Sequence, residues 1–328
     1  MLRRLGSWDV LVIVVLAAVV VVSSATVEGF ASSRFWGFLL LDVIPIALIA
    51  LPMTFVIVTG EIDLSVASVL GLSSAVMGQL WLSGVPLPLI LPLVLVLGAV
   101  LGAVNGLFVT GFGLPSLAVT IGTLALYRGL AYVVLGDKAV ADFPFSWTGN
   151  TIEALPGTTV PWVALVVLAL AAVFGIVLHA TPIGRALFAM GNNQQAATFS
   201  GISVAKTKFW LFVLTATIAA LAGFFWTMRY ASARADNGGG LELSVVAAVL
   251  LGGVSIFGGR GNLLGVIAGV LLLITLRNAL QLADVPADTL TVVTGALLIV
   301  SVVGPNAASM IRARLRRRRP AVSTAAGG

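Results

Sequence analysis

Long apolar runs separated by short polar connections occupy most of the chain. A helix of about 20 apolar residues crosses the ~30 Å hydrocarbon core of a bilayer, and turn residues and charges divide the runs into segments of about that size. The predicted spans are residues 10–27, 37–59, three spans within 64–135 that are separated by turns at 83–86 and 110–115, then 161–178, 209–228, 243–257, 262–280 and 289–303. The pattern therefore predicts an all-α polytopic membrane protein with about ten transmembrane helices.

The composition agrees with this pattern and excludes a soluble fold. Of the 328 residues, 59% are hydrophobic and 9% are charged, and the mean hydropathy is +1.13. Soluble domains carry about 25% charged residues, so this chain has too little polar surface to cover itself in water. The chain contains no cysteine, which excludes disulfide frameworks, thiol catalysis and cysteine-based metal sites.

The distribution of basic residues predicts the orientation in the membrane. The net charge is +6, and six of the fifteen arginines lie within residues 312–319, where they form no folded basic face for nucleic acid. With the N-terminus inside, the predicted inner segments hold twelve Lys and Arg residues and the outer segments hold four. The positive-inside rule then predicts that both termini are cytoplasmic. Residues 1–311 form one predicted transmembrane domain, and residues 312–328 form a basic cytoplasmic tail that we expect to be disordered.

Two short motifs recur in the same order in the two halves of the chain. GEIDLSV at residues 60–66 is matched by GGLELSV at 239–245, and LGAVLG at 97–102 is matched by LGVIAG at 264–269. One explanation is chance similarity between segments rich in Gly, Leu and Val. The other is gene duplication. Because five predicted spans separate the copies, the halves would then be inverted repeats, which is a common transporter plan.

Polar residues inside or beside the predicted spans are candidates for a translocation path. A charge at bilayer depth costs ~2.5–3.5 kcal/mol on insertion scales, so an acid kept there suggests a function. The first repeat motif contributes Asp63 and Ser65, the second contributes the corresponding Glu242 and Ser244, and Asn105 lies in the fourth span. These five residues are the predicted path. Asp63 and Ser65 could instead be helix caps at the interface, and Asn105 could hold two helices together.

The sequence predicts a non-catalytic chain that binds no cofactor and no metal of its own. It contains no Ser/His/Asp or His/Glu constellation and no GxxxxGK[ST] phosphate loop, so ATP binding by that route is excluded. Arg128 and Arg277 fall near predicted span ends, where we expect their side chains to reach the membrane interface.

The polar segment 181–208 is longer than a simple connection requires. Turn-forming residues divide it into short helical pieces, and Ala196, Ala197 and Phe199 supply a small apolar face. The pattern indicates a short helix on the cytoplasmic side that docks a partner, and the alternative is an ordinary amphipathic surface helix. The residues predicted for docking are Gly184, Gly191, Asn192, Ala196, Ala197 and Gly201.

Four segments together resemble the permease family of bacterial ABC importers for simple sugars. TGEIDLSVAS at residues 59–68 is similar to the family's GGIDLSVGS, with Glu61 where glycine is usual. The other three are VNGLFVTGFGLPSLAVTIGTLALYRG, GRALFAMGNNQQAATFSGISV and VLLGGVSIFGGRGNLLGVIAG. YASARADNG and VPADTLTVVTGALLIVSVVG are most similar to the rhamnose and autoinducer-2 type.

The resemblance implies a function, partners and a location. The chain would form the path for a monosaccharide or a related small polyol-like solute of the rhamnose, autoinducer-2 or pentose class. A sugar-type ABC ATPase, which binds ATP and Mg²⁺, would dock on residues 181–208. The other implied partners are a second permease copy or paralogue, an extracytoplasmic sugar-binding protein and the lipid of the bacterial plasma membrane. A stand-alone secondary transporter or channel for a small polar solute is the alternative, and a membrane-embedded enzyme is disfavoured because no catalytic cluster is present.

Overall fold

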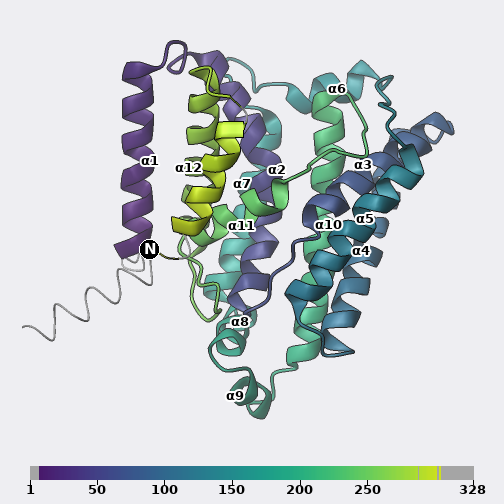
Figure 1. The fold of residues 1–328 in the computed structure, drawn as a ribbon, viewed down its shortest axis with the longest axis vertical. Helices are drawn as coiled ribbons and strands as arrows, with labels where there is room; N and C mark the ends of the chain where they lie inside the picture. The colour runs from purple at the N-terminus through teal and green to yellow at the C-terminus, as the bar shows by residue number, and fades with distance from the viewer. Residues whose placement is uncertain (1–6, 287, 301–302, 304–328) are drawn as a thin grey trace, which may run out of the picture.

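The structure is a computed structural model that describes residues 7–286, 288–300 and 303, so the predicted tail at 312–328 lies outside the described residues. The described part is helical apart from turns and two isolated β-bridges, and α1 stands at one edge beside α12 (Figure 1). The helices are α1 (Ser7–Thr26), α2 (Ser33–Val58), α3 (Val66–Leu82), α4 (Leu87–Thr110), α5 (Ser116–Leu135), α6 (Phe145–Ile152), α7 (Trp162–Ala180), α8 (Pro182–Asn192), α9 (Gln194–Phe199), α10 (Val204–Tyr230), α11 (Leu241–Leu251) and α12 (Leu263–Leu282), followed by an apolar helix at Asp288–Val300.

Within the described residues, seven helices are long and apolar enough to cross a membrane: α1, α2, α4, α5, α7, α10 and α12. The other three predicted spans correspond to shorter apolar helices, α3, α11 and Asp288–Val300. Glycine explains the early end of α11, because Gly253 has a φ of +88° that does not continue a right-handed helix. The all-helical membrane fold is thus confirmed, whereas three of the predicted spans are shorter than expected.

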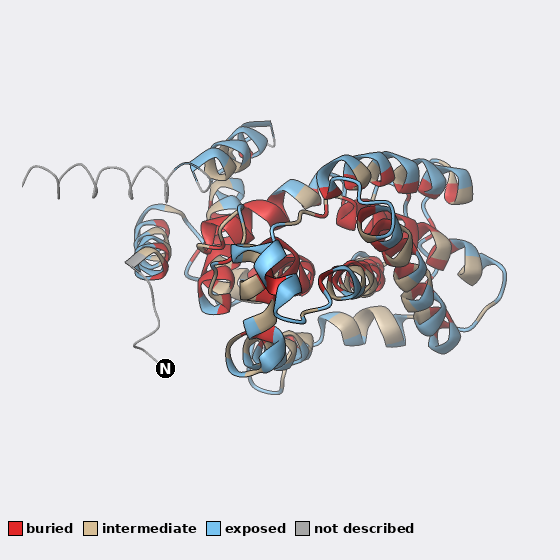
Figure 2. Cartoon of the chain, turned by 90° about the horizontal axis from the view of Figure 1, so that it is seen from below, coloured by how far each residue is buried: buried red, intermediate tan, exposed pale blue. Residues whose placement is uncertain are grey.

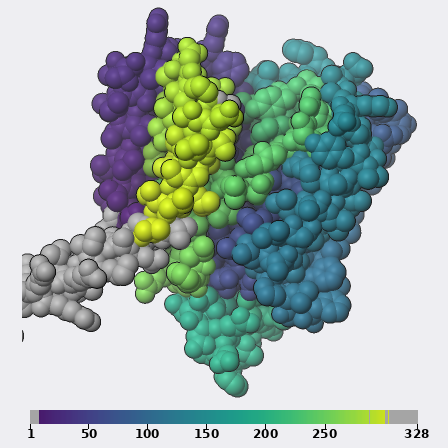
Figure 3. Space-filling view, viewed as in Figure 1, coloured from purple at the N-terminus to yellow at the C-terminus, as the bar shows by residue number. Residues whose placement is uncertain are grey.

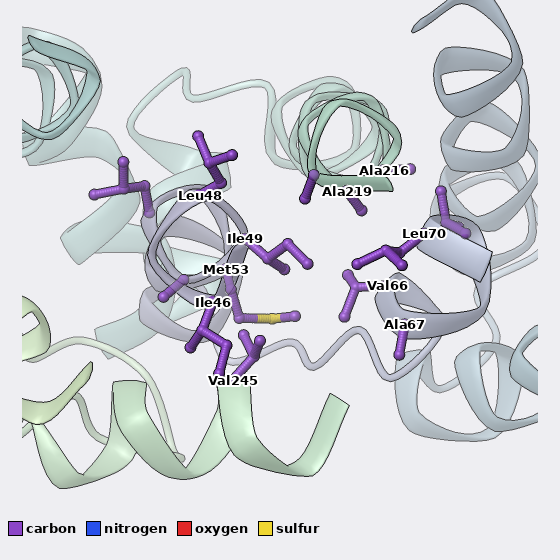
Figure 4. Close-up of a cluster of buried hydrophobic side chains, with 14 of the residues drawn as sticks. Ile46, Leu48, Ile49, Met53, Val66, Ala67, Leu70, Ala216, Ala219 and Val245 are labelled. Carbon is purple, nitrogen blue, oxygen red and sulfur yellow. The ribbon is translucent and has the colours of Figure 1, made fainter. Parts of the chain in front are cut away.

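The centre of the protein is formed around α2. In its most apolar window 89% of the α2 residues are buried, compared with 17% for α1 and for α7. Ile49 and Met53 of α2 gather with Leu70 of α3, Ala219 of α10 and Val245 of α11 in one apolar cluster (Figure 4). Helices at the edge of the bundle have exposed outward faces (Figure 2). Since those faces are largely apolar, they suit contact with lipid.

A close helix crossing joins α4 to α10 through small residues. A Cβ atom added at Gly102 would lie 2.5 Å from the backbone oxygen of Phe212 and 2.7 Å from the Cα of Val213. A Cβ added at Gly98 would meet Ala220 in the same way, at 2.6 Å. Glycines spaced four apart allow such close backbone approach in membrane helices.

Gly102→Ala is therefore expected to destabilise the protein, because the added methyl group overpacks a rigid backbone contact at a cost of about 1–3 kcal/mol. Gly129→Ala in α5 is the matched control, since a Cβ there meets nothing within 4 Å and alanine favours a helix by up to ~1 kcal/mol. The measurement is thermal unfolding of the detergent-purified proteins. Equal melting temperatures for the two variants would contradict the close crossing.

Candidate functional site

A polar cavity lies where α2, α10 and α12 meet the connection at residues 231–240. Its volume is about 690 Å³, and α11 and the Asp288–Val300 helix complete its walls. Concave sites of this kind hold small-molecule solutes. The polar lining residues are Asp42, Arg229, Arg234, Asp236, Asn237, Ser244, Arg277, Asn278, Gln281, Thr291 and Thr294.

Asp42 of α2 joins two other helices at the wall of this cavity. Its carboxylate forms an ion pair with Arg229 of α10 and accepts a 2.6 Å hydrogen bond from Asn278 Nδ2 of α12. The Arg229 side chain is 8% exposed, whereas that of Asp42 is 29% exposed. A buried guanidinium needs a counter-charge, so Asp42 both compensates Arg229 and fixes the relative positions of α2, α10 and α12.

Aromatic rings add an apolar surface to the same wall. The ring centroids of Trp226 and Tyr230 are 5.0 Å apart, and the guanidinium carbon of Arg229 lies 4.9 Å from the Tyr230 centroid. Ring faces beside a few hydrogen-bonding groups are typical of sites for small polar molecules. Because the wall carries both donors and acceptors, it can satisfy hydroxyl groups, which donate and accept.

An exposed ion pair lies at the rim of the cavity. Arg234 donates from Nε and Nη2 to the two carboxylate oxygens of Asp236, at 2.8 and 2.9 Å. These hydrogen bonds hold the pKa of Asp236 below its ordinary value. Both side chains are about half exposed, and exposed pairs contribute little stability. The pair therefore serves mainly to keep the charge at the rim balanced and oriented.

The five predicted path residues occupy different places in the structure. Ser244 lines the cavity, and Glu242 lies two residues before it in the first turn of α11 without belonging to the lining. Asp63, Ser65 and Asn105 are brought together, but in a buried network away from the cavity. Of the five predicted path residues, Ser244 alone is therefore among the residues that line the cavity.

The buried network connects the start of α3 to α4 and α5. Asp63 Oδ1 accepts hydrogen bonds from the backbone N–H of Ser65 at 2.9 Å and from Ser65 Oγ at 2.6 Å. Asn105 Nδ2 donates to Ser65 Oγ at 2.8 Å, and Tyr127 donates to Asn105 Oδ1 at 3.3 Å and to the Leu101 carbonyl at 3.0 Å. All these side chains are at most 2% exposed. This geometry favours a helix-linking role for Asn105 over a solute contact.

Asp63→Asn is expected to fold normally, because the amide oxygen can still accept both hydrogen bonds from Ser65. Asp63→Leu removes that acceptor and leaves the buried Ser65 N–H unpaired, which costs about 1–3 kcal/mol. Thermal unfolding of the two detergent-purified variants measures the difference. A melting temperature for Asp63→Leu equal to that of the wild type would show that the network contributes no stability.

The Arg128 side chain does not extend freely outward, as its position near a span end suggested. Its guanidinium turns inward and donates to the carbonyls of Ala235 at 2.6 Å, Asn237 at 2.9 Å and Ala67 at 3.0 Å. Gly71 leaves room for the Arg128 side chain, because a Cβ atom at position 71 would lie 2.3 Å from Arg128 Nη1. Three backbone carbonyls therefore take the place of water around the Arg128 cation. Arg277, in contrast, is exposed.

Helices α8 and α9 project as a knob beyond the ends of the long helices (Figures 1 and 3). Gly184 and Gly191 anchor this knob, since a Cβ at either position would lie 1.9 Å from a backbone oxygen, that of Leu178 or Val58 respectively. Asn192 Nδ2 contacts the Gly259 carbonyl at 3.4 Å. These three predicted docking residues therefore fix the knob to the body of the protein.

The exposed face of α9 differs from the predicted one at Ala197. That side chain is 3% exposed, whereas Ala196 is exposed and Phe199 is 92% exposed. Gly201 lies after the helix with a φ of +85°. Adjacent residues on a helix point about 100° apart, so in a helix of six residues the sequence alone did not distinguish the inner from the outer alanine. Ala197 is thus removed from the candidate docking face, which keeps Ala196 and Phe199.

Sequence reasoning missed the residues that form the cavity wall. Asp42 lies within the second predicted span, at residues 37–59, and Arg229 and Asn278 lie 187 and 236 residues from it. The signal that could have found the group is the acid itself, because a charge inside an apolar span needs a partner. No local spacing identifies which residue of α10 or α12 supplies that partner.

Comparison with known proteins matches the chain to permease proteins of transport systems. The family described as "Branched-chain amino acid transport system / permease component" matches residues 35–302. The autoinducer 2 import system permease protein LsrD of Yersinia enterocolitica is 34% identical over 290 residues, which is 86% of this chain and 87% of that protein. The protein of the same name from Escherichia coli strain SMS-3-5 is 35% identical over 269 residues, covering 80% and 81% of the two chains. No solved structure matches.

Proposed function

This chain belongs to the branched-chain amino acid transport system / permease component family, and we infer that it is the membrane-spanning subunit of an ATP-driven importer for a small hydroxylated solute. The observation that carries the inference is the match to import permeases over four-fifths or more of the chain. It favours a subunit of a multi-component importer over a stand-alone transporter or channel. The chain is accordingly a multi-pass membrane protein of the bacterial inner membrane.

The solute class follows from the cavity and from the relatives. The name of the matched family refers to branched-chain amino acids, whereas the similar proteins are named as permeases of autoinducer 2 import systems. A wall that combines Asp42, Asn278 and the rings of Trp226 and Tyr230 suits several hydroxyls on a compact carbon skeleton. The solute is therefore a monosaccharide or a related polyol-like molecule of the rhamnose, autoinducer-2 or pentose class.

The energy and much of the selectivity come from partners. A sugar-type ABC ATPase docks on the exposed face of α9 and holds ATP and Mg²⁺, while this chain is non-catalytic and binds no cofactor. A second permease copy or a paralogue completes the path, and an extracytoplasmic sugar-binding protein delivers the solute at the opposite end. The projecting knob of α8 and α9 supports this arrangement, because it places Phe199 92% exposed to a docking partner.

The membrane arrangement comprises ten crossings with both termini inside and two inverted halves. Support comes from α3 and α11, which are both short and lie at the two copies of the repeated motif: the first copy ends at Val66, the first residue of α3, and the second runs into the start of α11. Each copy also contains a glycine of positive φ, Gly60 at +84° and Gly240 at +78°. A reporter enzyme that is active only outside the cytoplasm should be silent when fused after Gly328. The same reporter fused after Asp142 should be active, and strong activity at Gly328 would overturn the orientation.

The function is tested by reconstituting the chain with its ATPase and binding protein in vesicles. We expect ATP-dependent accumulation of a labelled hydroxylated solute, with rhamnose, ribose and autoinducer 2 as the test compounds. Leucine is the contrasting solute, because it offers an apolar side chain where the others offer hydroxyls. Accumulation of leucine alone would overturn the solute class, and accumulation without ATP would overturn the importer assignment.

A further inference from the structure

A buried ion pair lies between the projecting knob and the break that separates α2 from α3. Lys208 Nζ, in the second turn of α10, is 2.5 Å from Glu61 Oε1 and 3.0 Å from Gln194 Oε1, the first residue of α9. The Lys208 side chain is 7% exposed and that of Glu61 is 18% exposed. One ammonium group therefore bridges the knob to the α2–α3 break.

Glu61 is held firmly on the side of α2. Gly60 ends that helix with a φ of +84°, and the backbone N–H of Glu61 donates to the Val56 carbonyl at 3.2 Å. A movement of Glu61 therefore has to move the end of α2 or bend the break. The side chain has little freedom to absorb the movement, because its carboxylate is fixed on Lys208.

The residues that follow Glu61 connect it to two more helices. The N–H of Ile62 donates to Ser116 Oγ at 3.2 Å, and Thr120 Oγ1 donates to the Ile62 carbonyl at 3.3 Å, so this residue lies on the start of α5. Asp63 and Ser65 then lead through Asn105 to α4. Hydrogen bonds and the short backbone segment 61–65 thus connect α9, through Lys208 and Glu61, to α5 and α4.

We propose that Glu61 and Lys208 are positioning residues that transmit the ATPase-driven movement of the α8–α9 knob to the α2–α3 break. This proposal rests on the proposed function and adds to it the residues that couple ATP hydrolysis to transport. The pair suits this role because a buried pair interacts strongly and its separation requires an uncompensated charge to be buried. The α2–α3 break therefore moves together with the α8–α9 knob.

The test measures ATP hydrolysis and solute uptake separately in reconstituted vesicles that contain the chain, its ATPase and its binding protein. Glu61→Gln and Lys208→Met are expected to co-purify with the ATPase and to keep hydrolysis near the wild-type rate. Solute taken up per ATP should fall by about tenfold or more, the size expected when a hydrogen bond to a charged group is lost. The exchanged pair Glu61→Lys with Lys208→Glu should recover part of that ratio.

Two further variants keep the proposal testable if a buried change prevents folding. Gln194→Leu alters an exposed residue of α9 and removes its side-chain contact with Lys208. It should lower uptake per ATP by about threefold, less than Glu61→Gln does, because Glu61 still holds the ammonium group. Lys206→Met, an exposed change two residues before Lys208, should leave the ratio unchanged. A wild-type ratio in both Glu61→Gln and Gln194→Leu would overturn the proposal, as would a parallel loss of hydrolysis and uptake. Absence of ATP-driven uptake in the wild-type protein would instead overturn the proposed function.

Discussion

Asp42→Leu is expected to lower the stability of the protein by about 3–5 kcal/mol and to abolish uptake, because it leaves the guanidinium of Arg229 buried without a counter-charge. Arg229 is 8% exposed, and Asp42 is its ion-pair partner. The same change removes the acceptor of Asn278 Nδ2 and so one of the links between α12 and α2. Thermal unfolding in detergent and uptake in vesicles are the two measurements.

The double variant Asp42→Leu with Arg229→Met separates stability from function. Apolar residues of similar size often replace a buried ion pair with little loss of stability, so the double variant should melt close to the wild type. Its uptake should remain low, because the cavity wall has lost a carboxylate and a guanidinium that can bind hydroxyls. Wild-type uptake in the double variant would show that the pair does not contact the solute path.

Arg277→Met is the matched control for charge loss at the same cavity. Arg277 also lines the cavity but is exposed to solvent, so its removal should change the melting temperature little. If Arg277→Met were as destabilising as Asp42→Leu, loss of any charged side chain at the cavity would have the same effect, and the buried pair would not be the cause.

Phe199→Glu is expected to abolish assembly with the ATPase and all ATP-driven uptake, while the chain itself folds normally. The side chain is 92% exposed at the end of α9 and makes no contribution to the core. In the assembled importer the carboxylate would enter an apolar contact, and burying an unpaired charge is costly. The measurement is co-purification of the ATPase with a tagged chain, followed by uptake in vesicles.

Phe145→Glu provides the control, because Phe145 is 84% exposed at the first residue of α6, at the opposite end of the long helices from the knob (Figure 1). It introduces the same charge in place of the same ring and should leave ATPase co-purification intact. Normal co-purification with Phe199→Glu would exclude α9 as the docking helix. Ala197→Glu is less informative, because Ala197 is buried and a charge there would disturb the knob itself.

The features that could be predicted from sequence are those set by local composition. Apolar length predicted the long helices, and the glycines and polar residues of 181–208 predicted short helical pieces outside the bundle. The docking of a partner on them stays a prediction. The orientation of Ala197 could not be predicted, because it depends on which side of α9 packs against the rest of the protein. Asp42 and Arg229 could not be paired for a similar reason, since their contact depends on the packing of α2 against α10.

Arg128 is another residue whose contacts could not be predicted from the sequence. A cation near a span end usually extends to the interface, and only the tertiary structure reveals three carbonyls placed to receive it. Local chemistry therefore located the polar residues, whereas long-range packing decided their roles.

The inward position of Arg128 has a consequence for biosynthesis. Ala67 has already been made when the ribosome completes α5, but Ala235 and Asn237 follow Arg128 by 107 and 109 residues. Until translation passes residue 237, only one of the three carbonyl partners of the guanidinium has been made. The hydrogen bonds that fix Arg128, and through it α5, are therefore complete only after residue 237 has been translated.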